Sequence, residues 1–169
     1  PKITTKSDHI ITNSIDSILT EFVSNIELME NTNIESTVLL ESTENSRLIY
    51  SGANVSLNIL RNPPPNEDFN KGKQIVSVLL EGRFTSQYSN TTIANSVDFK
   101  NKINNGKLII VSDGDIIRNI YNPYTTMHYP LGYYQYSSNP KDFSIFNGNK
   151  EFLINSIQYL CGDENLIKI

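Results

Sequence analysis

Two runs of mainly apolar residues, 75–80 and 108–111, dominate the hydrophobic pattern of the chain. Glu81, Gly82 and Arg83 follow the first run, and Ser112, Asp113, Gly114 and Asp115 follow the second. Runs of valine, isoleucine and leucine without alternation are typical of strands buried on both faces in the middle of an α/β sheet. Because ligands bind at the carboxyl ends of strands in such sheets, we expect any site at that edge.

The first half of the chain predicts further strands. Residues 37–40 form a short apolar run that predicts a buried strand. Residues 55–60 alternate between apolar and polar, which predicts a half-exposed strand joined to residues 47–50 by a turn at Gly52. Residues 18–29 fit either an amphipathic helix or two strand pieces, and the pattern leaves both open.

The second half predicts two long loops and one clear helix. Residues 84–105 are polar with scattered apolar positions, and predict a long loop with at most a helical turn. Residues 121–146 hold six of the nine tyrosines, and prolines there prevent long regular structure. The last helix is predicted to begin at Asn149, to end at Gly162 and to cover one face of the sheet. Its expected apolar stripe is Phe152, Leu153, Ile157, Leu160 and Cys161.

These elements predict one α/β domain over residues 1–169, with a mixed, partly parallel sheet and flanking helices. A chain of 169 residues is long enough to bury a substantial core as one domain. It begins at Pro1 without a methionine, so we expect it to be excised from a longer protein.

Composition narrows the possible functions. The chain carries 14 Lys and Arg against 18 Asp and Glu, a net charge of −4 without a long run of either sign, which argues against nucleic-acid binding. The single cysteine, Cys161, excludes an internal disulfide and a cysteine-based metal cluster. Its place on the last helix predicts a buried apolar role rather than a reactive thiol. No stretch approaches the roughly 18 to 20 apolar residues of a membrane helix.

The most distinct polar motif is Asp113-Gly114-Asp115, directly after the second run. Its two carboxylates could hold a divalent cation, although the motif lacks the acidic loop and distal glutamate of a calcium-binding hand. The alternative, which we favour, is a tight turn whose aspartates cap a short helix over residues 116–120. Glu81 and Arg83 flank a glycine and could pair with each other or with Asp113 and Arg118.

Catalytic motifs are missing from the sequence. No serine or cysteine elbow is followed by a histidine and a carboxylate, and no glycine-rich loop could cradle a phosphate. The remaining enzymatic alternative is a metal-assisted hydrolase or amidotransferase-like enzyme that uses Asp113 and Asp115. The tyrosine-rich segment either forms a contact surface or covers the sheet edge, and the residue types favour neither.

A set of segments along the chain forms a recognisable combination: residues 8–10, 39–42, 46–47, 78–86, 111–119, 130–133 and 147–155, with Tyr159 and Leu160. These segments resemble the GldG family of gliding-motility ABC-transporter proteins of Bacteroidetes. The resemblance follows the order of the chain over nearly its whole length, and one departure is Thr91, where the family has an arginine.

The resemblance implies the carboxyl-terminal part of an extracytoplasmic region, at the periplasmic face of the inner membrane and anchored by membrane helices. Its implied partners are the ABC permease and ATPase subunits of the same system. The implied fold is similar to the flavodoxin-like, three-layer class I glutamine amidotransferase domain without its catalytic cysteine, which agrees with the missing elbow.

We therefore expect a non-catalytic transporter module that needs no metal or cofactor and binds a partner protein or an unknown ligand. The candidate binding residues lie after the two apolar runs and in the tyrosine-rich segment: Glu81, Arg83, Ser86, Asp113, Asp115, Arg118, Tyr133 and Tyr134.

Overall fold

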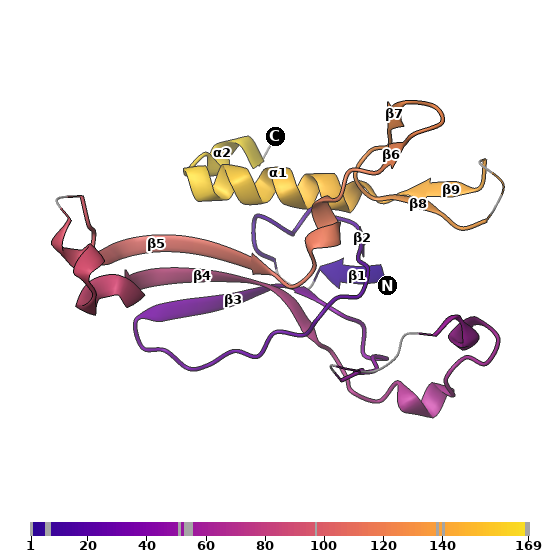
Figure 1. The fold of residues 1–169 in the computed structure, drawn as a ribbon, viewed down its shortest axis with the longest axis horizontal. Coiled ribbons are helices and arrows are strands. Elements are labelled where there is room, and N and C mark those ends of the chain that lie inside the picture. Colours follow the sequence, from indigo (N-terminus) through magenta and orange to yellow (C-terminus); the bar gives the residue numbers. More distant parts are fainter. Residues whose placement is uncertain are drawn as a thin grey trace.

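The centre of the fold is a five-stranded sheet in the order β2-β1-β3-β4-β5 (Figure 1). The computed structural model describes residues 2–5, 8–50, 52, 56–96, 98–137, 139 and 141–167 of the chain. The strands of the sheet are β1 (Lys2–Thr5), β2 (Ile18–Leu19), β3 (Ile34–Glu41), β4 (Ile75–Thr85) and β5 (Lys102–Val111).

Two small hairpins and two helices complete the structure. The hairpins pair β6 (Tyr121–Asn122) with β7 (Met127–His128), and β8 (Tyr133–Gln135) with β9 (Phe143–Ile145). The helices are α1 (Asn147–Cys161) and the single turn α2 (Glu164–Ile167). Five 3-10 turns lie in the connections: η1 (Leu57–Leu60), η2 (Asn66–Asp68), η3 (Gln87–Asn90), η4 (Thr92–Asn95) and η5 (Gly114–Ile117).

Every strand pair among the described residues is antiparallel. The predicted mixed, partly parallel α/β sheet is therefore wrong, and so is the flavodoxin-like, amidotransferase-like three-layer fold. The physical reason lies in the connection between the two apolar runs. A parallel pair needs a crossover, usually a helix. The described residues between 86 and 101 instead hold the turns η3 and η4, and the chain returns as a hairpin.

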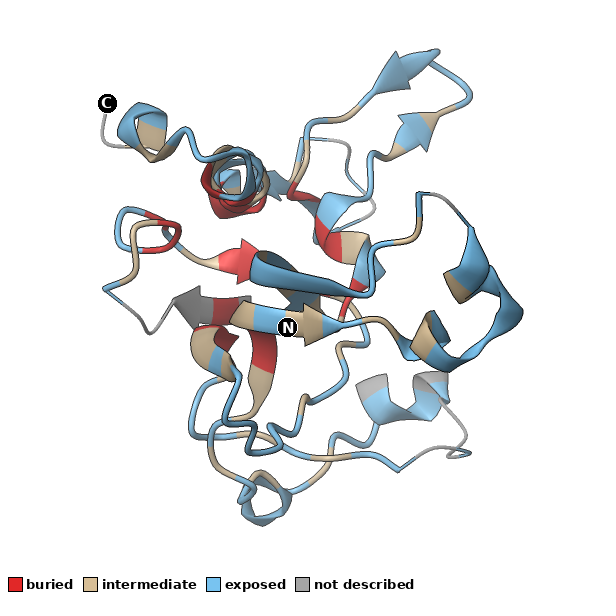
Figure 2. Cartoon of the chain, turned by 90° about the vertical axis from the view of Figure 1, so that its left-hand side faces the viewer, coloured by how far each residue is buried: buried red, intermediate tan, exposed pale blue. Residues whose placement is uncertain are grey.

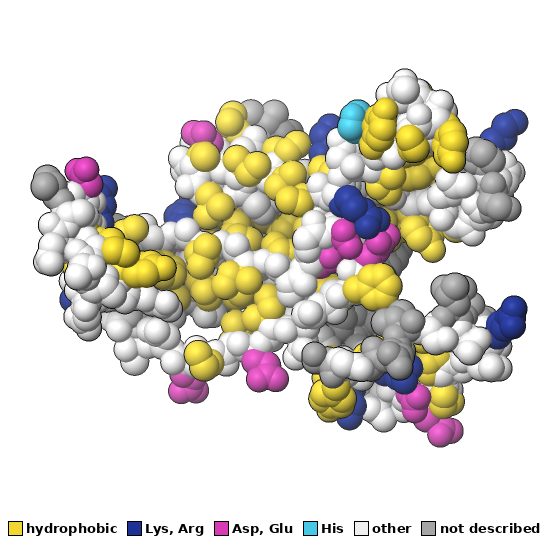
Figure 3. Space-filling view, in the orientation of Figure 1, with side chains coloured by type: hydrophobic (Ala, Val, Ile, Leu, Met, Phe, Trp, Pro, Cys, Tyr) yellow, Lys and Arg dark blue, Asp and Glu magenta, His cyan; other side chains and the backbone are white. Residues whose placement is uncertain are grey.

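The second apolar run is not buried on both faces, because β5 is an edge strand. Ile109 and Val111 pack against the core, whereas Leu108 and Ile110 are 45% and 39% exposed. Hydrophobic side chains gather over α1 and β5 on the face seen in Figure 3. The side chains of this apolar run thus have two different environments: one face of β5 packs against the core, and the other face is partly exposed.

The strands of the long β4–β5 hairpin include residues that the sequence had predicted to be loop. Thr85 pairs with Lys102, so the strands extend into both ends of the segment 84–105. Gly82 lies opposite Gly106, and a Cβ on Gly106 would lie only 2.5 Å from Cδ2 of Phe84. The Phe84 ring therefore packs over the backbone of β5, where only glycine leaves room.

The predicted hairpin around Gly52 is wrong where the structure describes it. Residues 47–50 are not in a strand, and residues 57–60 form the turn η1, capped by Ser56. Residues 51 and 53–55 lie outside the described residues. The strand at 37–40 is confirmed as part of β3. Residues 18–29 form the short strand β2 and then an extended segment, in which Ile26 N donates to Ile75 O.

The predicted apolar stripe of helix α1 is only partly confirmed: Phe152 packs on the sheet as predicted, but most of the other stripe positions do not. Phe152 and Tyr159 are buried, but Ile157, Leu160 and Cys161 are exposed. The predicted carboxyl-terminal cap is confirmed, since Gly162 has a φ of +82°. Buried residues lie where α1 faces the sheet (Figure 2). The core cluster contains Ile3, Ile11, Ile15, Ile18, Leu39, Leu40, Val76, Leu79, Ile116, Phe152 and Tyr159.

Candidate functional site

The antiparallel pairing separates the predicted site residues. Val111, at the end of β5, lies opposite Ser77 near the start of β4, whereas Ser86 follows the far end of β4. Asp113 and Ser86 therefore lie at opposite ends of the β4–β5 ladder. The expected single edge of carboxyl ends does not exist in this sheet.

Glu81 belongs to a polar cluster between the sheet and α1. Tyr159 Oη donates to Glu81 Oε1 at 2.9 Å. Lys107 Nζ lies 3.8 Å from the same oxygen, 3.2 Å from Glu164 Oε1 and 3.9 Å from the centre of the Tyr159 ring. The His9 ring meets the Tyr159 ring edge-on at 4.9 Å. These contacts attach α1 to β4 and β5, which is a structural role for Glu81.

The cluster changes the ionisation of its members. Burial lowers the pKa of His9 below 6.5, against the opposing effects of Glu81 and Glu164. Burial raises the pKa of Tyr159, and the hydrogen bond to Glu81 adds to it. For Lys107, burial alone would lower the pKa, but the contacts with Glu164, Tyr159 and Glu81 outweigh it and raise the pKa. The cluster therefore favours a neutral His9 and a charged Lys107.

Arg83 and Ser86 lie toward the tip of the β4–β5 hairpin. The backbone N–H of Arg83 donates to Asn33 O, and the Ser86 hydroxyl accepts from Tyr88 N as the cap of η3. Both contacts hold the local backbone, and neither brings these side chains to the other predicted residues.

Asp113 is almost fully buried and binds two backbone groups. Its Oδ1 accepts from Asp115 N at 2.8 Å, as the N-cap of η5, and its Oδ2 accepts from Glu21 N at 2.8 Å. The cap interpretation is therefore confirmed for Asp113, although the helix is a single 3-10 turn rather than the predicted 116–120. The second bond ties η5 to the segment that follows β2.

Arg118 completes an ion cluster beside this cap. Its Nη2 lies 2.9 Å from Glu21 Oε2, and its Nη1 lies 3.2 Å from Asp115 Oδ1. The three side chains are partly exposed. Sequence reasoning identified Asp115 and Arg118 but missed Glu21, because a contact across 97 residues leaves no local signal.

Asn149 is a buried junction rather than the predicted helix cap, which is Phe146. Its Oδ1 accepts from Leu19 N at 2.8 Å, and its Nδ2 donates to Leu19 O at 2.8 Å and to Ile116 O at 3.0 Å. A single side chain thus joins α1, β2 and η5. It holds together the backbone segments next to the ion cluster.

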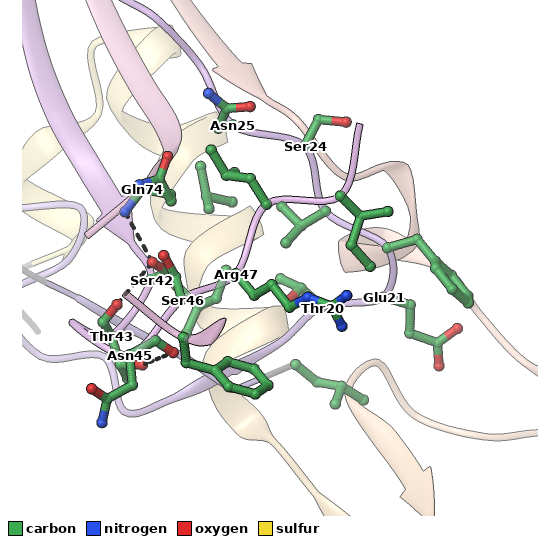
Figure 4. A pocket seen from close by; sticks show the side chains of 18 of the residues that line it. Thr20, Glu21, Ser24, Asn25, Ser42, Thr43, Asn45, Ser46, Arg47 and Gln74 are labelled. Carbon is green, nitrogen blue, oxygen red and sulfur yellow. Dashed lines mark hydrogen bonds between the residues drawn. The ribbon is translucent and has the colours of Figure 1, made fainter. Parts of the chain in front are cut away.

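A groove of about 680 Å³ opens beside this ion cluster (Figure 4). Ile3 and Val76 at its base are buried core residues, whereas Phe22 and Ile49 are largely exposed. Phe22 has a φ of +52°, which is uncommon for an aromatic residue. The lining comes from residues 19–25 at the end of β2 and after it, residues 42–43 and 45–49 after β3, and Ile3, Phe69, Gln74, Val76, Tyr134 and Phe146.

Two residues connect the groove with the predicted site. Glu21 lines the groove and also binds Arg118, and Tyr134 lines the groove from β8. Tyr133 is buried instead and stacks on Tyr129 at 4.1 Å, so it holds the hairpin. Adjacent residues of a strand point to opposite faces, which explains their different roles.

The described residues offer no obvious metal centre or membrane span. No group of three or more His, Cys, Asp and Glu side chains among them is placed to hold a metal ion. Both carboxylate oxygens of Asp113 accept backbone hydrogen bonds. None of the helices in the described segments combines the length and the apolar character needed to cross a bilayer.

Comparison with known proteins identifies the family. Residues 1–156 match the model of a family described as an ABC-type uncharacterized transport system. No curated protein and no solved structure matches the chain. The family match supports an ABC-transporter auxiliary protein without distinguishing the gliding-motility type. The chain belongs to this family of auxiliary components of ABC-type transport systems.

Proposed function

We propose that the chain is a non-catalytic, extracytoplasmic domain of a gliding-motility-type ABC transporter component. It acts in transport or assembly by binding a ligand or a partner segment in the groove. The longer protein is anchored at the periplasmic face of the inner membrane and works with the permease and ATPase subunits. Family membership supports the transporter association, and the sequence resemblance supports the finer assignment.

The groove is the observation that carries this proposal. Its size lies within the roughly 300 to 1,000 Å³ of small-molecule sites. Polar and apolar residues line it in similar numbers, but most of the lining surface is apolar, as is typical of such sites. Its walls come from segments far apart in the chain. Because Ile3 and Val76 at its base belong to the core of the sheet, the base is rigid.

The ion cluster of Glu21, Asp115 and Arg118 supports one wall of the groove. Asp113 holds the backbone of Glu21, and Arg118 holds its side chain. We infer that these residues orient the 19–25 wall, while Tyr134 contacts the bound group directly. Glu81, Arg83 and Ser86 do not line the groove, so we do not assign them to the binding surface.

The proposal is tested by placing a charge in the groove without disturbing the core. Ile49 lines the groove and is 59% exposed, and Ile93 in η4 is 54% exposed and lies outside it. We expect Ile49→Asp in the full-length protein to reduce transporter-dependent cell spreading, because a carboxylate is costly in an apolar site. The matched control Ile93→Asp should leave spreading unchanged.

Two further measurements make the outcome specific. Both variants should melt at the wild-type temperature, since both positions are exposed. Co-purification with the permease and ATPase shows whether the groove acts in assembly or only in transport. If Ile49→Asp supports spreading as well as Ile93→Asp does, the groove is not the functional site.

A further inference from the structure

The charges in the groove indicate which chemical class it binds. Apart from Tyr134, the ionisable residues of its lining are Glu21 and Arg47. Glu21 is already paired with Arg118 at 2.9 Å. Arg118, which lies outside the groove, is shared by Glu21 and Asp115, so the Glu21 carboxylate is already held in an ion cluster. Arg47 is the cationic residue of the lining that could hold a ligand.

Arg47 makes one long ion pair among the described residues, with Asp68. Its Nε lies 3.9 Å from Asp68 Oδ2, which is too long for a hydrogen bond, and both side chains are partly exposed. Asp68 does not line the groove. Figure 4 shows the Arg47 side chain extended into the pocket. A guanidinium offers a planar fork of donors that suits carboxylate and phosphate oxygens.

The apolar surroundings of Arg47 define the rest of the ligand. Leu48, Val23 and Phe69 line the same groove as the guanidinium. The protein as a whole carries a net charge of −4, so a small inorganic anion is not attracted by the overall field. The affinity for the ligand must then come mainly from apolar contact. Arg47 orients the ligand and selects one with a negative group.

We propose that the groove binds an amphiphile with an apolar chain and one anionic head group, a carboxylate or a phosphate, held by Arg47. This inference rests on the proposed function and names its ligand class. The bound molecule places its chain against the base near Val76 and its head group at Arg47. An apolar molecule with a cationic head is rejected by like charge.

The test titrates purified chain with dodecanoate, dodecyl phosphate and dodecyltrimethylammonium, each below its micelle concentration, in a calorimeter. The first two distinguish a carboxylate from a phosphate, and the third tests the sign of the charge. We expect Arg47→Gln to weaken binding of at least one anion by roughly tenfold or more, because a charge-assisted hydrogen bond is lost. The control Arg61→Gln changes an exposed arginine outside the groove and should have no effect.

The results separate this inference from the proposed function. If neither anion binds, or if Arg47→Gln binds them as the wild type does, the ligand class is wrong. Loss of spreading in Ile49→Asp would then still support a functional groove. If the anions bind through Arg47 but cells with Ile49→Asp spread normally, the ligand class is supported and the role of the groove in transport is contradicted.

Discussion

At the scale of single residues, Asp113 and Asn149 hold the backbone segments beside the groove in place. Asp113 accepts from two backbone N–H groups, and Asn149 makes three hydrogen bonds to the backbone of Leu19 and Ile116. Both side chains are buried, so each bond satisfies a group that water cannot reach. Both therefore have structural roles, although Asp113 was a candidate site residue in the sequence analysis.

The two aspartates of the motif should therefore respond differently to substitution. Asp113→Ala leaves two backbone N–H groups without their acceptor, and we expect a loss of about 2 to 3 kcal/mol in the free energy of unfolding. Asp115→Ala removes a partly exposed ion-pair partner and should cost less than about 1 kcal/mol. Urea unfolding measures both values. Equal stability of the two variants would contradict the structural role of Asp113.

His9 makes the stability of the protein depend on pH. Its pKa is lowered in the folded state, mainly by burial, so protonation favours the unfolded chain. Stability is full above pH 6.5 and falls as the pH drops through 6.5 toward the folded-state pKa. Glu81 and Glu164 oppose this shift, and Lys107 adds to it.

His9→Asn should flatten this dependence, because asparagine can still accept from Ile11 N, as His9 Nδ1 does at 3.3 Å, but does not titrate. Urea unfolding of both proteins above and below pH 6.5 provides the measurement. An equal loss of stability in wild type and variant on acidification would show that His9 is not the responsible group.

At the scale of elements, the structure shows what an apolar pattern can and cannot predict. The pattern located β3, β4 and β5 because long apolar runs favour strands in any sheet. It did not reveal their direction, since direction follows from the connection and not from the strand. The same limit applied to α1, which carries apolar residues on several faces, so that composition alone did not identify the buried one.

The candidate site was less predictable than the strands. Asp115 and Arg118 do form an ion pair beside the groove, and Tyr134 lines it, yet Glu21 and Arg47 had no recognisable motif. They reach the site through tertiary contacts of an irregular segment, and periodicity cannot report such contacts. The groove itself follows from how the segments after β2 and β3 pack, which no short pattern encodes.

The orientation of α1 can be tested with two truncations. Phe152→Ala empties a buried position and should cost about 3 to 5 kcal/mol, whereas Ile157→Ala removes a side chain that is 53% exposed and should cost less than about 1 kcal/mol. Thermal or urea unfolding gives both values. A larger loss for Ile157→Ala would mean that the helix packs through the stripe predicted from the sequence.

At the scale of the whole molecule, an antiparallel sheet with one covering helix supports a groove at its end. The base of the groove belongs to the core, while its rim consists of irregular segments and a small hairpin. A base in the core with a rim of irregular segments is a common arrangement for a binding site, and it is compatible with an auxiliary role in an ABC-type transport system.

The central claim is that the groove is the surface used in the transporter. Amide hydrogen exchange of the full-length protein, measured alone and with the permease and ATPase in membranes, tests it most directly. We predict slower exchange in residues 20–25 and 42–49, with no change in the hairpin segment 86–96. Protection confined to 86–96, with the groove segments unchanged, would contradict the claim.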